Sequence, residues 1–334
     1  MLKYTYMKKI IIAVIVVILV IIGVYFWYQN SSNVNAPTDQ GEITDTTNPI
    51  GGDQTGSTND EDDGQIVIGK SVQGRDIIAY NFSDEYSAST SVTADDTDTE
   101  ESDDDVELLF VGGIHGGYEW NTSLVAYQMM DYLTENPSVI PEDVNVTVIP
   151  VLNPDGLSKV LSASASTSLN GRFTASDVAT SDEILISGRF NANNVDLNRN
   201  FDCDWQSVGK WQNKDVSGGT AAFSEPESLA LKNYVEANEP DAVVVWYSAA
   251  GGVFASSCHN GVSTETRTLT NTFAKASGYK AYESFSFYEI TGDMVNWLAK
   301  KEIPAISILL TNHTDTEWTK NRSGIEAVLK HYAK

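Results

Sequence analysis

A histidine and a glutamate follow a run of apolar residues in the first half of the chain. The stretch VELLFVGGIHGGYEW covers residues 106–120 and places His115 four residues before Glu119. At this spacing, two side chains lie on one side of a helical turn or a tight loop. Imidazole and carboxylate groups are both zinc ligands in proteins. The pair is therefore a candidate metal site, although a hydrogen bond between a core histidine and a carboxylate would give the same pattern.

Five further motifs extend this stretch into an ordered set. They are IGKSVQGRDI (68–77), VIPVLNPDG (148–156), NNVDLNRNF (193–201), AVVVWYS (242–248) and AISILLTNH (305–313). The set resembles the zinc carboxypeptidase family, the carboxypeptidase A-like metallopeptidases, from about residue 68 to the C-terminus. The resemblance implies one zinc ion and a peptide substrate. It also implies either removal of residues from peptide C-termini or cleavage of cell-wall peptides.

The resemblance implies that His115 and Glu119 are two of the three zinc ligands. The family commonly places this pair three residues apart, and Gly116 and Gly117 could absorb the extra residue found here. The third ligand of the family is a histidine at the end of a strand, and the matching position holds Tyr247. A phenol is a poor zinc ligand unless it is ionised, and its ordinary pKa is about 10.

A second departure concerns the glutamate that activates water in the family. The matching position in the last strand holds Leu309, which cannot accept a proton. General-base catalysis typically contributes about 10²- to 10⁴-fold in rate. For the missing zinc ligand, His259 and His313 are the two candidate substitutes, if the chain folds either of them back to the site. Both departures could also be engineered.

Other family positions are intact. Asn198 and Arg199 match the pair that binds the C-terminal carboxylate of the substrate, for which a planar guanidinium is well suited. Asp196 matches the acid that orients the first zinc histidine. Arg189 matches the arginine that stabilises the oxyanion, with Arg172 as the alternative. A simpler interpretation is that Asp196 and Arg199 pair with each other and hold their loop.

Three functions remain open on these residues. The first is an impaired enzyme that still captures peptide C-termini through Asn198 and Arg199. The second is a working metallocarboxypeptidase or cell-wall peptide hydrolase with a rearranged zinc site. The third is an exported interaction module whose former active site has no catalytic role.

The elements that must position these residues alternate along the chain. A buried strand at 106–111 is followed by a helical pattern at 119–135, and further helices are predicted from Ser224, at 263–277 and at 316–332. This alternation indicates an α/β fold with a mainly parallel, buried sheet. The family resemblance adds a mixed sheet of about eight strands with helices on both faces. Residues 157–190 are rich in Ser, Ala and Thr, and we expect a long surface excursion there.

The N-terminal part of the chain has a different composition. Residues 10–27 are apolar or aromatic without interruption and follow three lysines, so residues 1–29 are predicted to anchor the chain in a membrane with the remainder outside. Secretion after signal cleavage is the alternative. Residues 30–64 are predicted to be a disordered acidic linker, and residues 65–334 the folded domain, with a disordered acidic insertion at 84–105.

The net charge and the cysteine content of the chain limit the classes of binding partner and indicate the cellular compartment. The formal net charge of −25 falls to about −7 without the eighteen acidic residues at 30–64 and 84–105, and neither value suits a nucleic-acid partner. Cys203 and Cys258 are the only cysteines, and both lie in the predicted exported part. Since export permits disulfides, we predict a Cys203–Cys258 bond, with two free core thiols as the alternative.

Overall fold

The computed structural model describes residues 64–83, 105–162 and 172–334. The predicted membrane anchor lies outside these residues, and so do nearly all of the predicted linker and insertion. No helix within the described ranges is long and apolar enough to cross a membrane.

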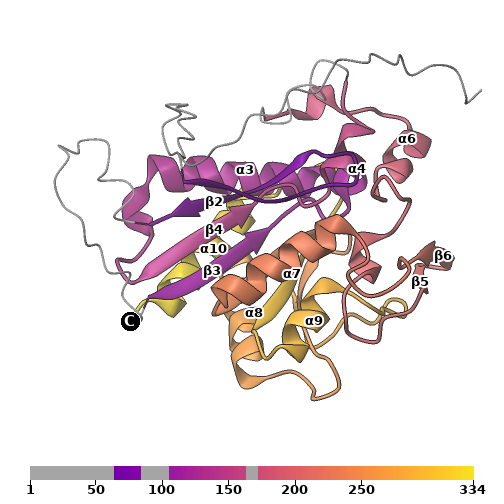
Figure 1. Ribbon diagram of the computed structural model, residues 1–334. Helices are drawn as coiled ribbons and strands as arrows, with labels where there is room; N and C mark the ends of the chain where they lie inside the picture. The colour runs from indigo at the N-terminus through magenta and orange to yellow at the C-terminus, as the bar shows by residue number, and fades with distance from the viewer. Residues whose placement is uncertain (1–63, 84–104, 163–171) are drawn as a thin grey trace, which may run out of the picture. The chain divides into compact units, whose positions relative to one another are not determined.

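An eight-stranded mixed sheet forms the centre of the folded domain (Figure 1). Its strands are β1 (Gln65–Lys70), β2 (Asp76–Phe82), β3 (Val106–Val111), β4 (Val144–Ile149), β7 (Ala242–Ser248), β8 (Gly252–Ala255), β9 (Ala281–Tyr282) and β10 (Ala305–Leu310). They lie in the order β1-β2-β4-β3-β7-β10-β8-β9. The four central strands, β4, β3, β7 and β10, are parallel to one another. Three pairs are antiparallel: β1 with β2, β2 with β4, and β8 with β10. The predicted sheet is thereby confirmed.

Helices cover both faces of this sheet, as predicted. One face packs against α3 (Trp120–Glu135), α8 (Thr264–Ser277) and α10 (Trp318–Tyr332). The other packs against α7 (Pro226–Asn238) and α9 (Met294–Lys300). Shorter elements are α4 (Pro154–Ser158), α6 (Asp182–Ser187), the 3₁₀ turns η2 (Gly116–Glu119), η3 (Pro137–Val139), η4 (Ala175–Asp177) and η5 (Leu197–Arg199), and the hairpin β5 (Val208–Trp211) with β6 (Lys214–Ser217). With both faces covered, the central strands are mostly apolar, with few polar residues in each.

Sequence signals predicted the ends of α8 correctly and the start of α7 incorrectly. The side chain of Ser263 caps α8 by accepting a hydrogen bond from the backbone of Thr266, and Gly278 ends the helix at φ +76°. The predicted start of α7 at Ser224 is wrong by one residue, because Glu225 is the residue preceding the helix. The Ser224 hydroxyl instead accepts from the backbone of Thr220 and from the side-chain amide of Asn200, so a tertiary contact replaces the cap.

The segment predicted as a surface excursion is partly buried. Phe173 and Val178 pack with Leu157, Val160 and Trp120 in a small core of their own. The prediction was wrong here because only scattered apolar residues contribute, and scattered residues give no helical or strand period.

The carboxyl ends of the parallel strands meet at one edge of the sheet. His115 follows β3, Asn153 follows β4, and Tyr247 and Leu309 lie near the ends of β7 and β10. In open α/β sheets, ligands bind at this edge. The topology therefore gathers the candidate residues from four separate segments.

Candidate active site

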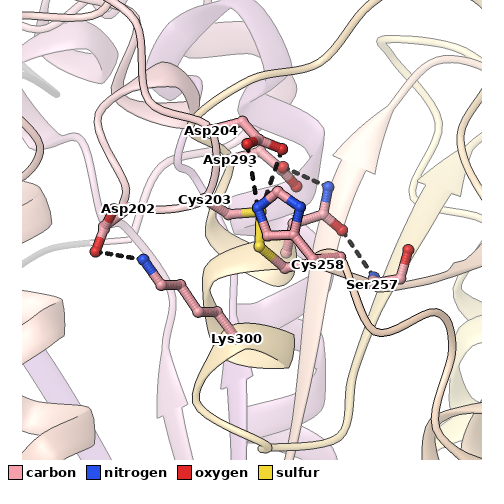
Figure 2. The surroundings of a disulfide bond; sticks show 9 residues. Asp202, Cys203, Asp204, Ser257, Cys258, Asp293 and Lys300 are labelled. Carbon is pink, nitrogen blue, oxygen red and sulfur yellow. Dashed lines mark hydrogen bonds and ion pairs between the residues drawn. A yellow bond between two sulfur atoms is a disulfide. The ribbon is translucent and has the colours of Figure 1, made fainter.

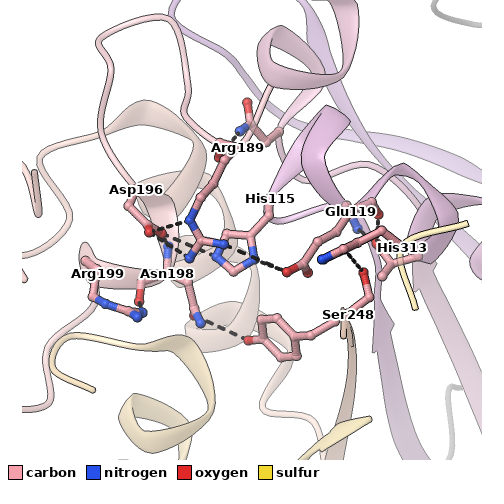
Figure 3. Close-up of polar contacts among 12 residues, drawn as sticks. His115, Glu119, Arg189, Asp196, Asn198, Arg199, Ser248 and His313 are labelled. Atoms are coloured by element: carbon pink, nitrogen blue, oxygen red, sulfur yellow. Dashed lines mark hydrogen bonds and ion pairs between the residues drawn. The ribbon is translucent and has the colours of Figure 1, made fainter. Parts of the chain in front are cut away.

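His115 and Glu119 lie against each other beneath the surface. Nδ1 of His115 is 3.0 Å from a carboxylate oxygen of Glu119, and both side chains are buried (Figure 3). The contact lacks hydrogen-bond geometry, so Nδ1 and the second oxygen of Glu119 are buried without a hydrogen-bonding partner among the described residues. Two buried, unpartnered donor atoms that face each other suit a shared cation.

A 3₁₀ turn accommodates the four-residue spacing of this pair. Residues Gly116–Glu119 form η2, which brings Glu119 back towards His115. Gly116 has φ +43°, and a Cβ there would lie 2.8 Å from the backbone of Gly156 and of Gly188. Only glycine suits both this conformation and this close approach. The glycines therefore allow the turn to pack directly on α4.

Tyr247 and Leu309 occupy directly opposed positions on neighbouring parallel strands. The register of β10 on β7 pairs Leu309 with Tyr247, so both side chains point to the same face of the sheet. The ring of Tyr247 lies 5.7 Å from that of His115, and its hydroxyl is 3.3 Å from the amide oxygen of Asn198. Burial raises the pKa of the Tyr247 hydroxyl well above its ordinary value, which disfavours the ionised form that a metal would bind.

The two substitute histidines lie in different places. His259 is exposed, beside the disulfide, and its Nε2 is 3.2 Å from Asp204 (Figure 2). His313 is closer to the site, because its Nδ1 is 2.8 Å from the hydroxyl of Ser248 (Figure 3) and burial lowers its pKa. The structure thus brings His313, but not His259, to the edge where His115 and Glu119 lie.

The donor set does not complete a three-ligand zinc site. Across the described residues, the only group of three His, Cys or carboxylate side chains with ligand atoms within 4.8 Å of one another is Cys203, Cys258 and His259, whose sulfurs form a disulfide. His115 and Glu119 provide two of the three protein ligands expected of a catalytic zinc site. Tyr247, which the sequence predicts at the position of the third ligand, has its hydroxyl engaged by Asn198.

Asp196 connects the pair to a buried arginine. One of its oxygens lies 3.3 Å from Nε2 of His115, and the other accepts from Nε of Arg189 at 2.9 Å and lies 2.8 Å from Nη2 in an ion pair. Burial alone would raise the pKa of Asp196, but the charges of Arg189 and Arg199 hold it well below its usual range. Asp196 is therefore a fixed anion behind His115, in the position to orient the imidazole.

Arg172, the alternative to Arg189, is excluded by its position. Its guanidinium is partly exposed, pairs with Asp131 and lies over the ring of Tyr127. Arg189 is buried, stacks on Trp211 at 4.5 Å and lies 3.8 Å from Glu119. Of the two arginines, only Arg189 adjoins the site.

Arg199 is a buried cation without a carboxylate partner in the described parts of the chain. Its Nε and Nη2 donate to the carbonyl of Lys210 at 2.9 and 2.7 Å, and Nη1 donates to the carbonyl of Asn198. The simple Asp196–Arg199 pair is absent, because Asp196 binds Arg189 instead. Carbonyls orient the guanidinium of Arg199, while Asp196 and Asp293 interact with its charge only from beyond ion-pair distance.

Two connected hollows surround these residues. The inner pocket has a volume of about 80 Å³, and the outer cleft about 800 Å³. The inner pocket is lined by residues that include His115, Glu119, Asn198, Arg199, Tyr247, Asp293 and Leu309. The outer cleft shares Glu119 and Leu309 with it and is bordered by residues that include Tyr118, Arg189, Trp211, Phe287 and His313.

Asp293 lines the inner pocket and was missed in the sequence. It precedes α9, so in the sequence it looks like an ordinary helix cap, yet its side chain makes no capping hydrogen bond. Burial raises the pKa of its carboxyl group to about 6, against the lowering effect of Arg199 and Asn296. No sequence pattern distinguishes a capping aspartate from one that faces a pocket.

The raised pKa of Asp293 predicts that an amide at this position stabilises the fold at neutral pH. An unfolded aspartate has a pKa of about 3.9, so between about pH 4 and pH 6 the folded state binds more protons and loses stability as the pH rises. Asp293→Asn should raise the free energy of unfolding by about 2–3 kcal/mol at pH 8 and by little at pH 4. Denaturant titrations at both pH values measure this; an equal change at both would contradict it.

A disulfide links Cys203 to Cys258, the residue after Ser257 of the inner-pocket lining (Figure 2). The carbonyl of Cys203 accepts from the backbone of Gly292 at 2.7 Å. On the other side, the backbone of Ser257 donates to Asn296, whose amino group donates to Asp293 at 2.7 Å. The bond therefore ties together the loops that hold Asp293.

Comparison with known proteins identifies relatives over most of the chain. A profile of the family described as zinc carboxypeptidase matches residues 64–330. A carboxypeptidase B of Helicoverpa zea is 30% identical over 138 residues, which cover 39% of this chain and 29% of that protein. A gamma-D-glutamyl-L-diamino acid endopeptidase of Lysinibacillus sphaericus is 26% identical over 149 residues, covering 43% and 37%. The chain therefore spans well under half the length of these relatives.

Solved structures share the fold at low identity. Thrombin activatable fibrinolysis inhibitor superposes with a TM-score of 0.59 at 16% identity, over 80% of this chain and 68% of that one. Murein-tripeptide amidase from Escherichia coli O157 superposes with a TM-score of 0.51 at 19% identity, over 81% and 92%. These likenesses concern the arrangement of the sheet and helices.

Proposed function

Since the chain belongs to the zinc carboxypeptidase family, we propose that its folded domain binds peptide C-termini and has lost most or all of its hydrolytic activity. In this proposal, Asn198 and Arg199 bind the terminal carboxylate, and Asp196 orients His115. Arg189 is the residue left to stabilise negative charge near Glu119. Tyr247 and Leu309 occupy the positions of the third zinc ligand and the general base.

The observation that supports capture of a carboxylate is that the buried Arg199 forms no direct ion pair among the described residues. Buried charges in proteins are normally paired, because transfer from water costs several kcal/mol per ion. The hydrogen-bond acceptors of Arg199 are carbonyls, its guanidinium carbon lies 6.0 Å from the centre of the Tyr288 ring, and it lines the inner pocket. The neighbouring amide oxygen of Asn198 accepts from the backbone of Met294 and from Tyr247, so its amino group is the part available to a ligand.

The observation that supports lost catalysis is the direct pairing of Tyr247 with Leu309. The strand register places the two departures from the family pattern side by side, facing His115 and Glu119 in one pocket. Leucine has no proton acceptor, and no third His, Cys or carboxylate of the described chain joins the pair. Both changes act on the same chemical step, one through the metal and the other through the base.

Removing the guanidinium should abolish most peptide binding. Charge-assisted hydrogen bonds typically contribute about 1.5–3 kcal/mol, so Arg199→Ala should weaken binding of a peptide with a free C-terminus about 10- to 100-fold. Isothermal titration of the full-length chain in detergent measures this. The same peptide with an amidated C-terminus should bind as weakly to the native chain as the free peptide does to the variant.

Two further variants separate binding from folding. Arg267→Ala removes an exposed arginine that pairs with Glu283 on the surface and should leave peptide affinity unchanged. Arg199→Lys keeps the charge but loses the planar fork, and should give an intermediate affinity. Equal affinity for free and amidated peptides would refute carboxylate capture and favour an interaction module without a ligand at this site.

An active enzyme is the second candidate, and His313 is the observation that favours it. This histidine borders the same outer cleft as Glu119 and Arg189. A rearrangement that brought His313 to His115 and Glu119 would complete a set of two His and one Glu. A murein-tripeptide amidase shares the fold, which makes cell-wall peptides one candidate substrate class. Stoichiometric zinc and turnover in the unaltered chain would favour this alternative.

We propose that the domain acts outside a membrane. The apolar stretch at 10–27, preceded by lysines, supports an N-terminal anchor, and the predicted export of Cys203 and Cys258 is compatible with their disulfide. Mass spectrometry of the protein from the membrane fraction tests this. An intact N-terminus supports the anchor, whereas loss of these residues indicates secretion after cleavage.

A further inference from the structure

Four side chains that can bind a metal ion surround the disulfide. Cys203 and Asp204 come from one loop, and Cys258 and His259 come from another. None of the four lines the inner pocket or the outer cleft. One ligand atom each of Cys203, Cys258 and His259 lies within 4.8 Å of the others, a convergence that no other such trio in the described ranges reaches. The disulfide therefore lies within a compact group of donors that is separate from the candidate active site.

Asp204 brings a fourth donor to this group. One of its carboxylate oxygens lies 3.2 Å from Nε2 of His259, and the other lies 4.0 Å from Sγ of Cys203 (Figure 2). The carboxylate thus lies between an imidazole of one loop and a sulfur of the other. The side chains of His259 and Asp204 are 66% and 57% exposed, so an ion can reach them from solvent.

The residue after each cysteine has a left-handed backbone conformation. Asp204 has φ +54° and His259 has φ +61°. Such values are uncommon outside glycine, although Asp and His adopt them more readily than most residues. The turn at His259 is closed by the backbone of Asn260, which donates to the carbonyl of Cys258 at 2.7 Å. An exposed ion pair contributes too little stability to require both turns, yet together they direct an imidazole and a carboxylate towards the two sulfurs.

We propose that these four side chains bind a zinc ion, or a cation of similar ligand preference, when the disulfide is reduced. A dithiol supplies two electrons and two protons, so that the S–S bond breaks, Cys203 and Cys258 become thiols and the dithiol becomes a disulfide. The cation then replaces the two thiol protons, which pass to water, while neutral His259 and the carboxylate of Asp204 complete four ligands. Thiolate and imidazole ligands favour zinc over magnesium or calcium, which bind oxygen ligands.

The backbone spacing of the two cysteines suits this site. A tetrahedral zinc ion holds two thiolate sulfurs about 3.8 Å apart, as Zn–S bonds of about 2.3 Å require. The Cα atoms of Cys203 and Cys258 are 6.2 Å apart. Rotation of the two side chains therefore brings the reduced sulfurs to this separation without moving the loops. The cation keeps the two loops joined while the disulfide is open.

Cobalt(II) tests the site, because thiolate ligands give this ion an intense near-ultraviolet absorption that histidine and carboxylate ligands do not. The full-length chain in detergent is reduced with a phosphine, separated from it by gel filtration without oxygen, and titrated with cobalt(II). We expect one absorbing cobalt ion per reduced chain. The oxidised chain, and Cys203→Ser combined with Cys258→Ser, should show no such absorption. Cobalt held by His115 and Glu119 has no thiolate ligand there and does not contribute.

Single substitutions test the two donors that flank the sulfurs. His259→Ala and Asp204→Asn should each weaken zinc binding to the reduced chain at least about 10-fold, as loss of even an indirect partner of a metal site does. Competition with a chromophoric chelator measures this affinity. Two matched controls should leave it unchanged: His331→Ala removes another exposed histidine, and Asp202→Asn removes a nearby aspartate that pairs with Lys300 (Figure 2).

Thermal unfolding separates the folded site from metal capture by an unfolded chain. Zinc should raise the Tm of the reduced native chain by more than it raises that of the oxidised chain, because only the reduced chain has this site. Three results would each overturn the proposal. They are a reduced native chain without the thiolate absorption, an affinity unchanged in both His259→Ala and Asp204→Asn, and cobalt bound to a chain that circular dichroism shows to be unfolded.

Discussion

Replacing Tyr247 by His and Leu309 by Glu in one chain should produce a protein that binds about one zinc ion and hydrolyses peptides. We expect hydrolysis to rise at least about 10²- to 10⁴-fold over the native chain, the range typical of a general base. Zinc content by atomic emission and release of the C-terminal residue from a peptide panel measure the two effects. No other pair of substitutions in this chain should change activity as much.

The reason lies in what the pocket already contains. His115 and Glu119 are preorganised as two ligands, and Asp196 holds the far side of the imidazole. A histidine at 247 would supply the third donor, and a bound zinc ion would act there as a Lewis acid on the substrate or on water. Because residue 309 is paired with residue 247 in the strand register, a glutamate there would lie beside the new ligand.

The single variants distinguish the two contributions. Tyr247→His alone should gain zinc but little turnover, since no base is present. Leu309→Glu alone should gain neither, and should lower stability because a carboxylate is buried without a partner. Stoichiometric zinc and turnover in the unaltered chain would show that the native site is competent. A double variant that binds zinc but never cuts would show that further parts of the machinery are missing.

Removing the disulfide should cause the largest loss of stability among simple changes outside the pocket. The bond closes a loop with a sequence separation of 55, for which chain entropy gives about 4 kcal/mol. Cys203→Ser combined with Cys258→Ser should lower the free energy of unfolding by this amount in denaturant titrations.

Reduction provides an internal control for this change. The native chain unfolded under reducing conditions should match the double serine variant, and the variant itself should not respond to reductant. A difference below about 1 kcal/mol between oxidised and reduced protein would mean that the unfolded state is already compact or that the loop is held by other contacts. The exposed pair of His259 and Asp204 beside the bond is too solvent-exposed to supply such a contact.

The fold followed from the sequence because its signals are local. Apolar strands alternating with amphipathic helices indicate a covered parallel sheet, and Ser263 and Gly278 mark the ends of one helix. Where the local pattern was weak, the prediction failed. Ser224 contacts Asn200, 24 residues earlier in the chain, and does not cap α7, and the burial of Phe173 depends on packing against Trp120.

The candidate site, like the fold, was predictable only in part from the sequence. The sequence by itself determined which residue types stand at the strand ends: a His and a Glu, an Asn-Arg pair, and a Tyr and a Leu where the family has a His and a Glu. These are matters of identity and order along the chain. They indicated the family, which the profile match confirms, and they support the proposal that hydrolytic activity is lost.

Only the tertiary structure decided which of these residues meet. It pairs Asp196 with Arg189, leaves Arg199 without a carboxylate partner among the described residues, sets His259 apart from the site and brings Asp293 into the pocket. No periodic pattern in the sequence predicts these contacts, because each depends on how segments far apart in the chain pack at one edge of a sheet. Burial then sets the charge balance there, since desolvation depends on the surrounding fold and not on the residue alone.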